Sequence, residues 1–257
     1  MIVARSILFQ LLFYGWTTVL AFAYLPVLAL PRGAVVVMGR LWSRSALWLL
    51  ARIVGITHRI EGAENLPGGR FIVAAKHQSA WDTLMVPLLF PDPVVILKKE
   101  LLQLPFYGWY ARKHGMIGID RKAGASALRG MVADAERAAA RGQTLVMFPE
   151  GTRTAPGERR PYQRGIAALY TRLELPVVPV ALNSGLYWPR RGPVLRPGVI
   201  TVRILLPIPP GLESGAFMER LQTDIEDASA ALLRDGCAGT GAGPVDDIGP
   251  QDVDKAH

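Results

Sequence analysis

Cysteine is almost absent from this chain of 257 residues: a single one, Cys237, stands near the C-terminal end. One cysteine excludes an intramolecular disulfide, so the chain is compatible with a reducing compartment. No G-x-S-x-G sequence occurs, which excludes the nucleophile elbow of the α/β-hydrolases. His58 and His114 lack Cys, Asp or Glu partners at the spacing of metal ligands. We therefore expect no metal site and no covalent cysteine chemistry.

Charge is absent from residues Ile7 to Leu30, a stretch of 24 residues between Arg5 and Arg32. As a helix this stretch would reach about 36 Å, enough for a hydrocarbon core of about 30 Å. A cleaved secretory signal is the alternative, but its apolar part is usually about 7 to 15 residues long and ends in a small-x-small site. The sequence favours a retained membrane helix.

A second apolar stretch, from Val35 to Val54, differs from the first because it carries charge. It contains Trp42 and Trp48 together with Arg40 and Arg44, a composition typical of a helix at a lipid interface. We expect residues 1–55 to form a membrane-anchoring helical hairpin. The alternative is that the second helix simply packs on the catalytic domain.

Beyond residue 55, short apolar runs alternate with helical patterns, which predicts an α/β domain with a mixed sheet flanked by helices over residues 56–234. The expected strands are 59–61, 71–75, 94–97, 116–119, 144–148, 177–182 and 199–205. The expected helices are 80–89, 101–114, 125–141, 165–174 and 213–234. Residues 235–257 are mainly Gly, Ala, Asp and Pro, and we expect a disordered tail there.

Acidic residues are outnumbered, 21 against 29 lysines and arginines, which gives a net charge of +8. A basic body favours anionic partners such as anionic lipid, phosphorylated substrates, coenzyme A or an acidic carrier protein. Nucleic acid belongs to the same class, but no recognition motif accompanies the charge, so we expect no nucleic-acid partner.

The first segment with chemical character is Lys76-His77-Gln78-Ser79-Ala80-Trp81-Asp82, directly after an apolar strand. A carboxylate five positions after a histidine, across a turn into a helix, can fold back onto one imidazole nitrogen. The other nitrogen would then take up a proton, with His77 as general base and Asp82 as its orienting partner. The alternative is structural, because Ser79 and Asp82 also fit a helix capping box.

The second such segment is Phe148-Pro149-Glu150-Gly151-Thr152-Arg153, again at the end of an apolar strand. Gly151 allows close approach of the backbone to a ligand, Thr152 offers a hydroxyl, and Arg153 has a planar fork suited to phosphate. A solvated basic loop is the alternative.

In this order, the motifs resemble the glycerolipid acyltransferase family that includes the 1-acylglycerol-3-phosphate (lysophosphatidic acid) acyltransferases. The resemblance is carried by His77 and Asp82, by Arg121 in Gly-Ile-Asp-Arg, by Glu150 to Arg153, and by the run Pro-Val-Val-Pro-Val at 176–180. It covers about residues 57 to 210. Lys76 departs from the pattern, since many members have Asn before the histidine, and a cation there could help to hold phosphate.

The resemblance implies a role for each matching residue. His77 and Asp82 are the catalytic pair, and Arg121, Glu150, Gly151, Thr152 and Arg153 bind the phosphate of the acceptor. Glu150 is expected to hold the arginines in place. Lys98 and Lys99 resemble another recurrent element of the family and are possible substrate contacts, with a surface pair as the alternative.

The implied reaction moves an acyl group from acyl-coenzyme A or acyl carrier protein to the sn-2 hydroxyl of 1-acylglycerol-3-phosphate, giving phosphatidic acid without a cofactor. Another lysolipid, such as a lyso-ornithine lipid, is the alternative acceptor, and a silent lipid-binding membrane protein is the alternative outside the enzymes. The expected location is the cytoplasmic face of the inner membrane.

Overall fold

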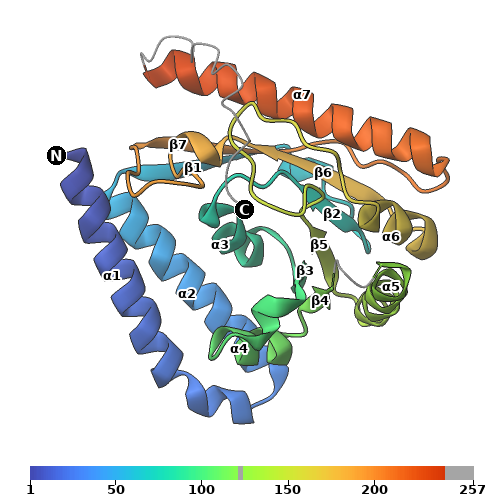
Figure 1. The fold of residues 1–257 in the computed structure, drawn as a ribbon, viewed down its shortest axis with the longest axis horizontal. Coiled ribbons are helices and arrows are strands. Elements are labelled where there is room, and N and C mark those ends of the chain that lie inside the picture. Colours follow the sequence, from blue (N-terminus) through green and yellow to red (C-terminus); the bar gives the residue numbers. More distant parts are fainter. Residues whose placement is uncertain (121–123, 241–257) are drawn as a thin grey trace, which may run out of the picture.

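The computed structural model describes residues 1–120 and 124–240, which form a seven-stranded sheet with helices on both faces (Figure 1). The strands are β1 (Ile56–Glu61), β2 (Ile72–Ala75), β3 (Pro93–Lys98), β4 (Ile117–Ile119), β5 (Thr144–Met147), β6 (Val177–Leu182) and β7 (Gly198–Ile204). The helices are α1 (Ile2–Ala23), α2 (Arg32–Ile53), α3 (Ala80–Leu89), α4 (Tyr107–His114), α5 (Gly124–Ala140), α6 (Gly165–Leu173) and α7 (Ser214–Thr240). The α/β fold with a mixed, helix-flanked sheet is therefore as predicted.

The strand order is β1-β7-β6-β2-β5-β3-β4, and β6 and β7 are the antiparallel pair. All other neighbours run parallel. Strands β2, β5 and β6 are buried along their whole length, as expected for parallel strands covered on both faces.

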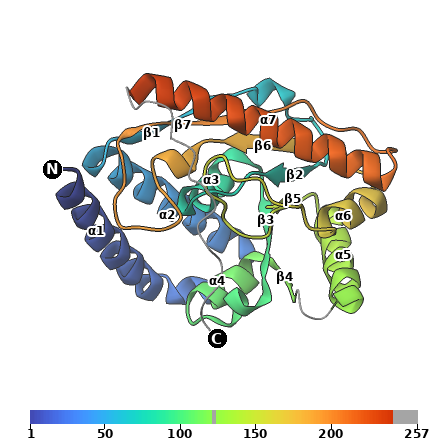
Figure 2. The same cartoon turned by 45° about the horizontal axis from the view of Figure 1, so that its top comes forward.

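Side-chain alternation divides the interior into two cores. On β2, Val73 and Ala75 pack with α2 and α3, whereas Ile72 and Ala74 pack with α5, α6 and α7. Helix α7 lies over β6 and β7 in both ribbon views (Figures 1 and 2). The sheet thus separates the N-terminal helices from the C-terminal helix.

Helices α1 and α2 run antiparallel and are joined by the 3₁₀ turn Leu25–Ala29 (Figure 1). Each is 22 residues long, and each is apolar and long enough to cross a membrane by length and composition alone. The indole Nε1 of Trp42 donates to Thr17 Oγ1 at 3.1 Å and ties the two helices together. The hairpin is as predicted, and α2 also packs on α3, so the two interpretations of this segment are compatible.

The boundaries of several helices differ from the sequence-based expectations. The uncharged stretch is not one helix, because Pro26 stands in the turn that follows α1. The expected helix 101–114 is divided at Pro105 and Phe106, where the amide of Tyr107 donates to the carbonyl of Pro105 at 2.7 Å. Helix α7 continues to Thr240, so residues 235–240 are helical, and the rest of the expected tail lies outside the described residues.

Candidate active site

The residues with chemical character gather where parallel strands end at one edge of the sheet. His77 follows β2, Glu150 follows β5, Ser184 follows β6, and Lys98 is the last residue of β3. Parallel strands direct their carboxyl ends to the same edge, which is where open α/β sheets bind ligands. Segments far apart in sequence therefore meet at one place.

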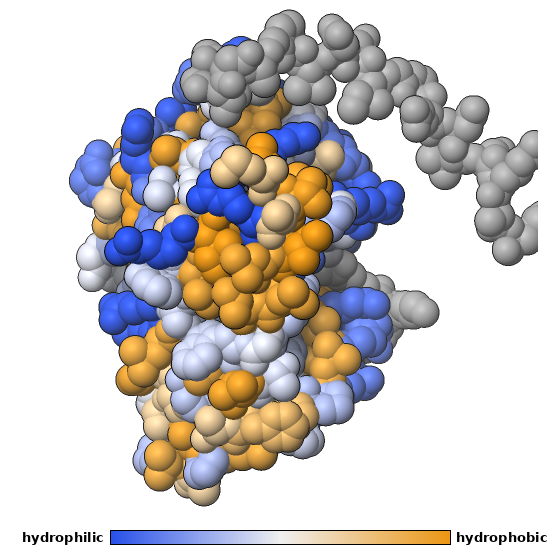
Figure 3. Space-filling view, turned by 90° about the vertical axis from the view of Figure 1, so that its left-hand side faces the viewer, coloured by the Kyte–Doolittle hydropathy of each residue, from blue (hydrophilic) through white to orange (hydrophobic). Residues whose placement is uncertain are grey.

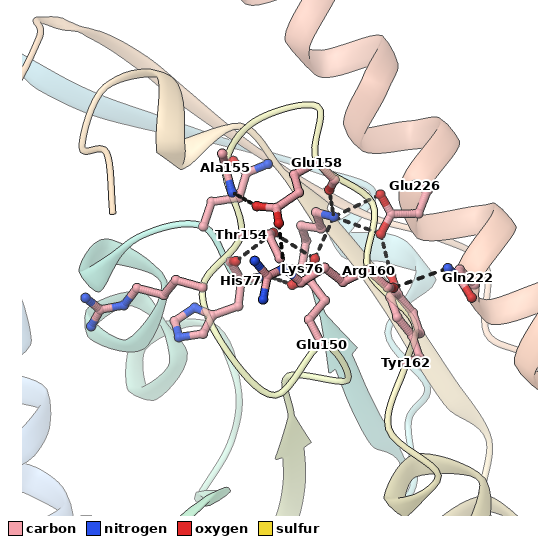
Figure 4. A network of polar contacts seen from close by, with 12 residues as sticks. Lys76, His77, Glu150, Thr154, Ala155, Glu158, Arg160, Tyr162, Gln222 and Glu226 are labelled. Carbon is pink, nitrogen blue, oxygen red and sulfur yellow. Dashed lines mark hydrogen bonds and ion pairs between the residues drawn. The ribbon is translucent and has the colours of Figure 1, made fainter. Parts of the chain in front are cut away.

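Alternation along β2 sends Lys76 and His77 to opposite faces of the sheet. The amide of Lys76 still donates to Val180 O at 2.9 Å, so the strand pairing continues to this residue. His77 lies on the face of Val73 and Ala75, and its ring stacks on Phe148 with centroids 4.1 Å apart. Figure 4 shows the His77 imidazole pointing away from the Lys76 ammonium. The His77 imidazole and the Lys76 ammonium therefore have different neighbours: the imidazole stacks on Phe148, and the ammonium binds Glu150 and Glu226.

His77 and Asp82 form the expected pair. The distance from His77 Nδ1 to Asp82 Oδ2 is 2.9 Å, and the two side chains are 12% and 1% exposed. Because a carboxylate only accepts hydrogen bonds, Nδ1 carries the proton and Nε2 has a free lone pair. No described residue hydrogen bonds to Nε2, so this atom is available to a substrate hydroxyl.

Asp82 also belongs to a helix cap, as the structural interpretation predicts, and this cap is compatible with its pairing with His77. Its Oδ2 accepts from the amides of Gln78 at 2.7 Å and Ser79 at 2.8 Å, and Ser79 Oγ accepts from the amide of Trp81. This is a capping box at the start of α3. The first turn of the helix fixes the carboxylate that orients the imidazole.

Glu150 is buried, and its partners differ from those expected. Its Oε1 lies 2.6 Å from Lys76 Nζ and accepts from Thr154 Oγ1, and its Oε2 accepts from the backbone amide of His77 at 2.8 Å. Burial raises the pKa of Glu150, and the charge of Lys76 opposes this rise. No arginine side chain of the described residues binds it. The expectation that Glu150 holds the arginines is wrong for these residues, because Glu150 binds the Lys76 ammonium and the backbone amide of His77.

Lys76 is buried as well, which corrects the expectation that it helps to hold phosphate. Its ammonium binds Glu150 and both oxygens of Glu226 on α7, at 2.8 and 2.9 Å (Figure 4). At 1% exposure it has no surface to offer to a ligand.

The loop after Glu150 holds Gly151, Thr152 and Arg153, which are half-buried. Gly151 has a φ of 71°, a left-handed conformation that favours glycine. The amide of Thr154 donates to the carbonyl of His77 at 2.8 Å and fixes the end of the loop against His77. No described carboxylate pairs with Arg153, which leaves its guanidinium available to an anion.

Three other residues were predicted to contact the substrate. Lys98 and Lys99 are exposed, and Lys98 Nζ lies 3.1 Å from Glu100 Oε1. Arg121 lies outside the described residues. Among the side chains that the structure describes, in residues 1–120 and 124–236, no three of His, Cys, Asp or Glu are grouped so that they could hold a metal ion.

Sequence reasoning missed Ser184, whose hydroxyl donates to Asp82 Oδ1 at 2.5 Å, and Thr154, whose hydroxyl donates to Glu150 Oε1 at the end of the loop 151–153. It also missed Glu226, the partner of Lys76 on α7. Ser184 comes two residues after the buried apolar run of β6, and a polar residue at the carboxyl end of such a strand is a signal that could have identified it. Glu226 gives no local signal, because it stands among other charged residues of an amphipathic helix.

The chain is similar to proteins of one known family. The model of the Acyltransferase family matches residues 57–183. The 1-acyl-sn-glycerol-3-phosphate acyltransferase of Pseudomonas aeruginosa is 37% identical over 205 residues, which are 78% of this chain and 79% of that protein. The Saccharomyces cerevisiae enzyme of the same name is 33% identical over 63% of this chain and 58% of its own length.

A solved structure has the same fold. The crystal structure of the 1-acyl-sn-glycerophosphate (LPA) acyltransferase PlsC from Thermotoga maritima superposes with a TM-score of 0.74. The match covers 91% of this chain and 98% of that one, at 24% sequence identity. The hairpin and the mixed sheet are therefore both features of a known architecture.

Proposed function

The chain belongs to the glycerolipid acyltransferase family, and we propose that it acylates the sn-2 hydroxyl of 1-acylglycerol-3-phosphate, giving phosphatidic acid. The proposal is carried by the imidazole of His77, whose Nδ1 is held by Asp82 while Nε2 is free. The acyl donor is a thioester, either acyl-coenzyme A or acyl carrier protein. The names of the relatives support the acceptor.

The reaction needs one proton to move twice. His77 Nε2 takes the proton of the glycerol hydroxyl as the oxygen attacks the thioester carbonyl, and Asp82 stabilises the imidazolium that forms. The tetrahedral intermediate then collapses, the carbon–sulfur bond breaks, and the imidazolium returns the proton to the departing thiolate. General-base assistance of this kind contributes about 10²- to 10⁴-fold in rate. No acyl-enzyme is required.

Arg153, with Gly151 and Thr152, is proposed to bind the phosphate of the acceptor, and Arg121 is proposed to add a second guanidinium. Arginine suits this role because its fork makes two charge-assisted hydrogen bonds to phosphate. Thr154 joins this loop to the carbonyl of His77. This contact supports a fixed distance between the bound phosphate and the base, which positions the hydroxyl.

Membrane attachment through α1 and α2 completes the proposal. Figure 3 shows apolar side chains gathered on the face of the molecule that α1 occupies, with hydrophilic residues beside them. The exposed apolar residues of α1 include Leu8, Leu11 and Val19. Lipid contact accounts for this exposure, since soluble monomers rarely expose large apolar patches. A cytoplasmic-face location at the inner membrane would bring the site to the thioester donors.

The test is acyl transfer from labelled acyl-coenzyme A and from acyl carrier protein, by detergent-purified protein, to lysophosphatidic acid and to other lysolipids. We expect phosphatidic acid from the wild type and a rate lower by about 10²- to 10⁴-fold for His77→Ala. His58→Ala, a histidine on β1 outside the site, is the matched control and should retain full activity. If the protein acylated only other lysolipids, such as a lyso-ornithine lipid, the proposed acceptor would be wrong. If it transferred an acyl group to no acceptor, the proposed acyltransferase activity would be wrong.

A further inference from the structure

Lys76 and Glu226 form a buried ion pair that the proposed reaction does not use. The Lys76 ammonium contacts both oxygens of Glu226 and one oxygen of Glu150, and the three residues are at most 3% exposed. Buried charges are costly unless they are paired and hydrogen-bonded. Two carboxylates from different parts of the chain thus share one cation, which joins β2, the loop after β5 and α7.

Further hydrogen bonds complete this cluster (Figure 4). Tyr162 OH donates to Glu226 Oε1 at 3.0 Å, and the Lys76 ammonium donates to the carbonyl of Glu158 at 3.2 Å. Burial raises the pKa of Tyr162, which keeps its hydroxyl protonated as a donor. In a connected buried network, a change at one member alters the others.

Glu150 connects the cluster to the base. One of its oxygens binds the Lys76 ammonium, and the other accepts from the backbone amide of His77 at 2.8 Å. The same carboxylate precedes the loop that carries Arg153. The charge state and position of Glu150 therefore act on the base and on the phosphate loop together.

We propose that Lys76 and Glu226 are positioning residues that hold Glu150, and through it the backbone of His77, in the geometry that acyl transfer requires. Helix α7, on the opposite face of the sheet from the imidazole, is then part of the machinery that places the base. This inference rests on the proposed role of His77. It assigns no contact with substrate to either residue.

Removing the Lys76 ammonium would leave the negative charges of Glu150 and Glu226 without a cation. Without Lys76, two buried carboxylates face each other with no cation between them, and one of them must take up a proton or move. If Glu150 is neutralised or moves, it becomes a weaker acceptor for the His77 amide. A displacement of the base by about 1 Å is enough to cost about 10²-fold in rate.

The experiment compares Lys76→Met, Glu226→Gln and their double variant with Ile225→Ala, full-length and in detergent. Ile225 neighbours Glu226 on α7 and is fully buried in the apolar core, so its truncation lowers stability without removing any charge or hydrogen bond of the cluster. For each protein, kcat and KM for lysophosphatidic acid, the melting temperature and the hydrogen exchange rate of the His77 amide are measured. Hydrogen exchange does not depend on turnover. If the proposed acceptor is wrong, no protein acylates lysophosphatidic acid but the exchange rate of the His77 amide still changes in the variants; if the positioning role is wrong, that exchange rate does not change.

We expect kcat to fall about 100-fold in Lys76→Met and about tenfold in Glu226→Gln. The double variant should be no worse than Lys76→Met, because both residues act through Glu150. The His77 amide should exchange faster in these variants and at the wild-type rate in Ile225→Ala. If Lys76→Met does not fold, the proposed positioning role is tested by Glu226→Gln alone, because this substitution keeps the shape of the side chain.

Three results would overturn the proposal. The first is a kcat within about twofold of wild type in folded Lys76→Met and Glu226→Gln, well below the expected loss. The second is a loss of kcat that follows the melting temperature as it does in Ile225→Ala, which would make the ion pair merely structural. The third is unchanged exchange of the His77 amide.

Discussion

Ser184 Oγ lies 2.5 Å from Asp82 Oδ1, the carboxylate oxygen that does not face His77. The two oxygens of Asp82 thus have separate tasks. Oδ2 caps α3 and binds the imidazole, and Oδ1 is held by a hydroxyl from the segment after β6. Ser184 therefore fixes the rotation of the carboxylate that orients the base.

Removing this hydroxyl should disturb the site more than it disturbs the fold. For Ser184→Ala we expect kcat to fall about tenfold and the free energy of unfolding to fall by about 1–3 kcal/mol, because a buried charged acceptor loses its donor. Kinetics and thermal unfolding measure both effects. Ser229→Ala is the control, since this buried hydroxyl on α7 has no hydrogen-bond partner in the described structure. Equal losses in the two variants would contradict a role for Ser184 in the site.

Substitution of Arg153 should affect binding of the acceptor, measured as KM. In Arg153→Ala we expect KM for lysophosphatidic acid to rise about tenfold or more, because hydrogen bonds to a charged partner contribute about 1.5–3 kcal/mol. Arg153→Lys should keep part of the attraction but lose the fork. The control is Arg137→Ala, an exposed arginine on α5 that pairs with Asp134. If KM for lysophosphatidic acid and for an uncharged acceptor rose equally, Arg153 would not be the phosphate ligand.

The sheet was predictable because its central strands are short, buried apolar runs. The expected strands 71–75, 144–148 and 177–182 match β2, β5 and β6 to within about one residue, whereas β1 begins at Ile56, earlier than expected. Most of β1 is exposed, so it lacks the apolar pattern by which strands are recognised. Strand order depends on contacts between distant segments, which periodicity does not report.

The site was predictable where its members are close in sequence. His77 and Asp82 are five residues apart, and one turn of chain decides their contact. Lys76 meets Glu226 across 150 positions, and Ser184 meets Asp82 across 102. Alternation along β2 did imply that Lys76 and His77 face opposite ways, and that inference was not drawn from the sequence.

His114 should make stability depend on pH between neutrality and mild acid. It is buried at the end of α4, and burial, aided by the charge of Arg32, lowers its pKa. As the pH falls through about 6.5, the ordinary value for histidine, the unfolded chain binds a proton that the folded protein does not. Stability is therefore retained above pH 6.5 and decreases below it.

The measurement is the melting temperature in detergent from pH 8 to pH 5. His114→Gln should be less stable at pH 8, because its contact with the carbonyl of Pro93 changes, but its profile should be flatter. Asp92, whose pKa is lowered by Arg32 although burial alone would raise it, contributes only below about pH 4, where carboxylates take up protons. A wild-type slope that persists in His114→Gln would assign the pH dependence to another group.

The exposed face of α1 should determine membrane binding. Leu8 and Leu11 are 50% and 69% exposed, and burying a leucine side chain in an apolar medium contributes about 1.5–3 kcal/mol. In Leu8→Gln/Leu11→Gln we expect the partition coefficient onto anionic vesicles to fall at least tenfold for each residue, as measured by flotation. Leu206→Gln is the control, because Leu206 is 68% exposed but follows β7 in the catalytic domain. If Leu206→Gln released the protein as strongly, lipid would contact the catalytic domain broadly. If neither variant released it, α1 would not be the anchor.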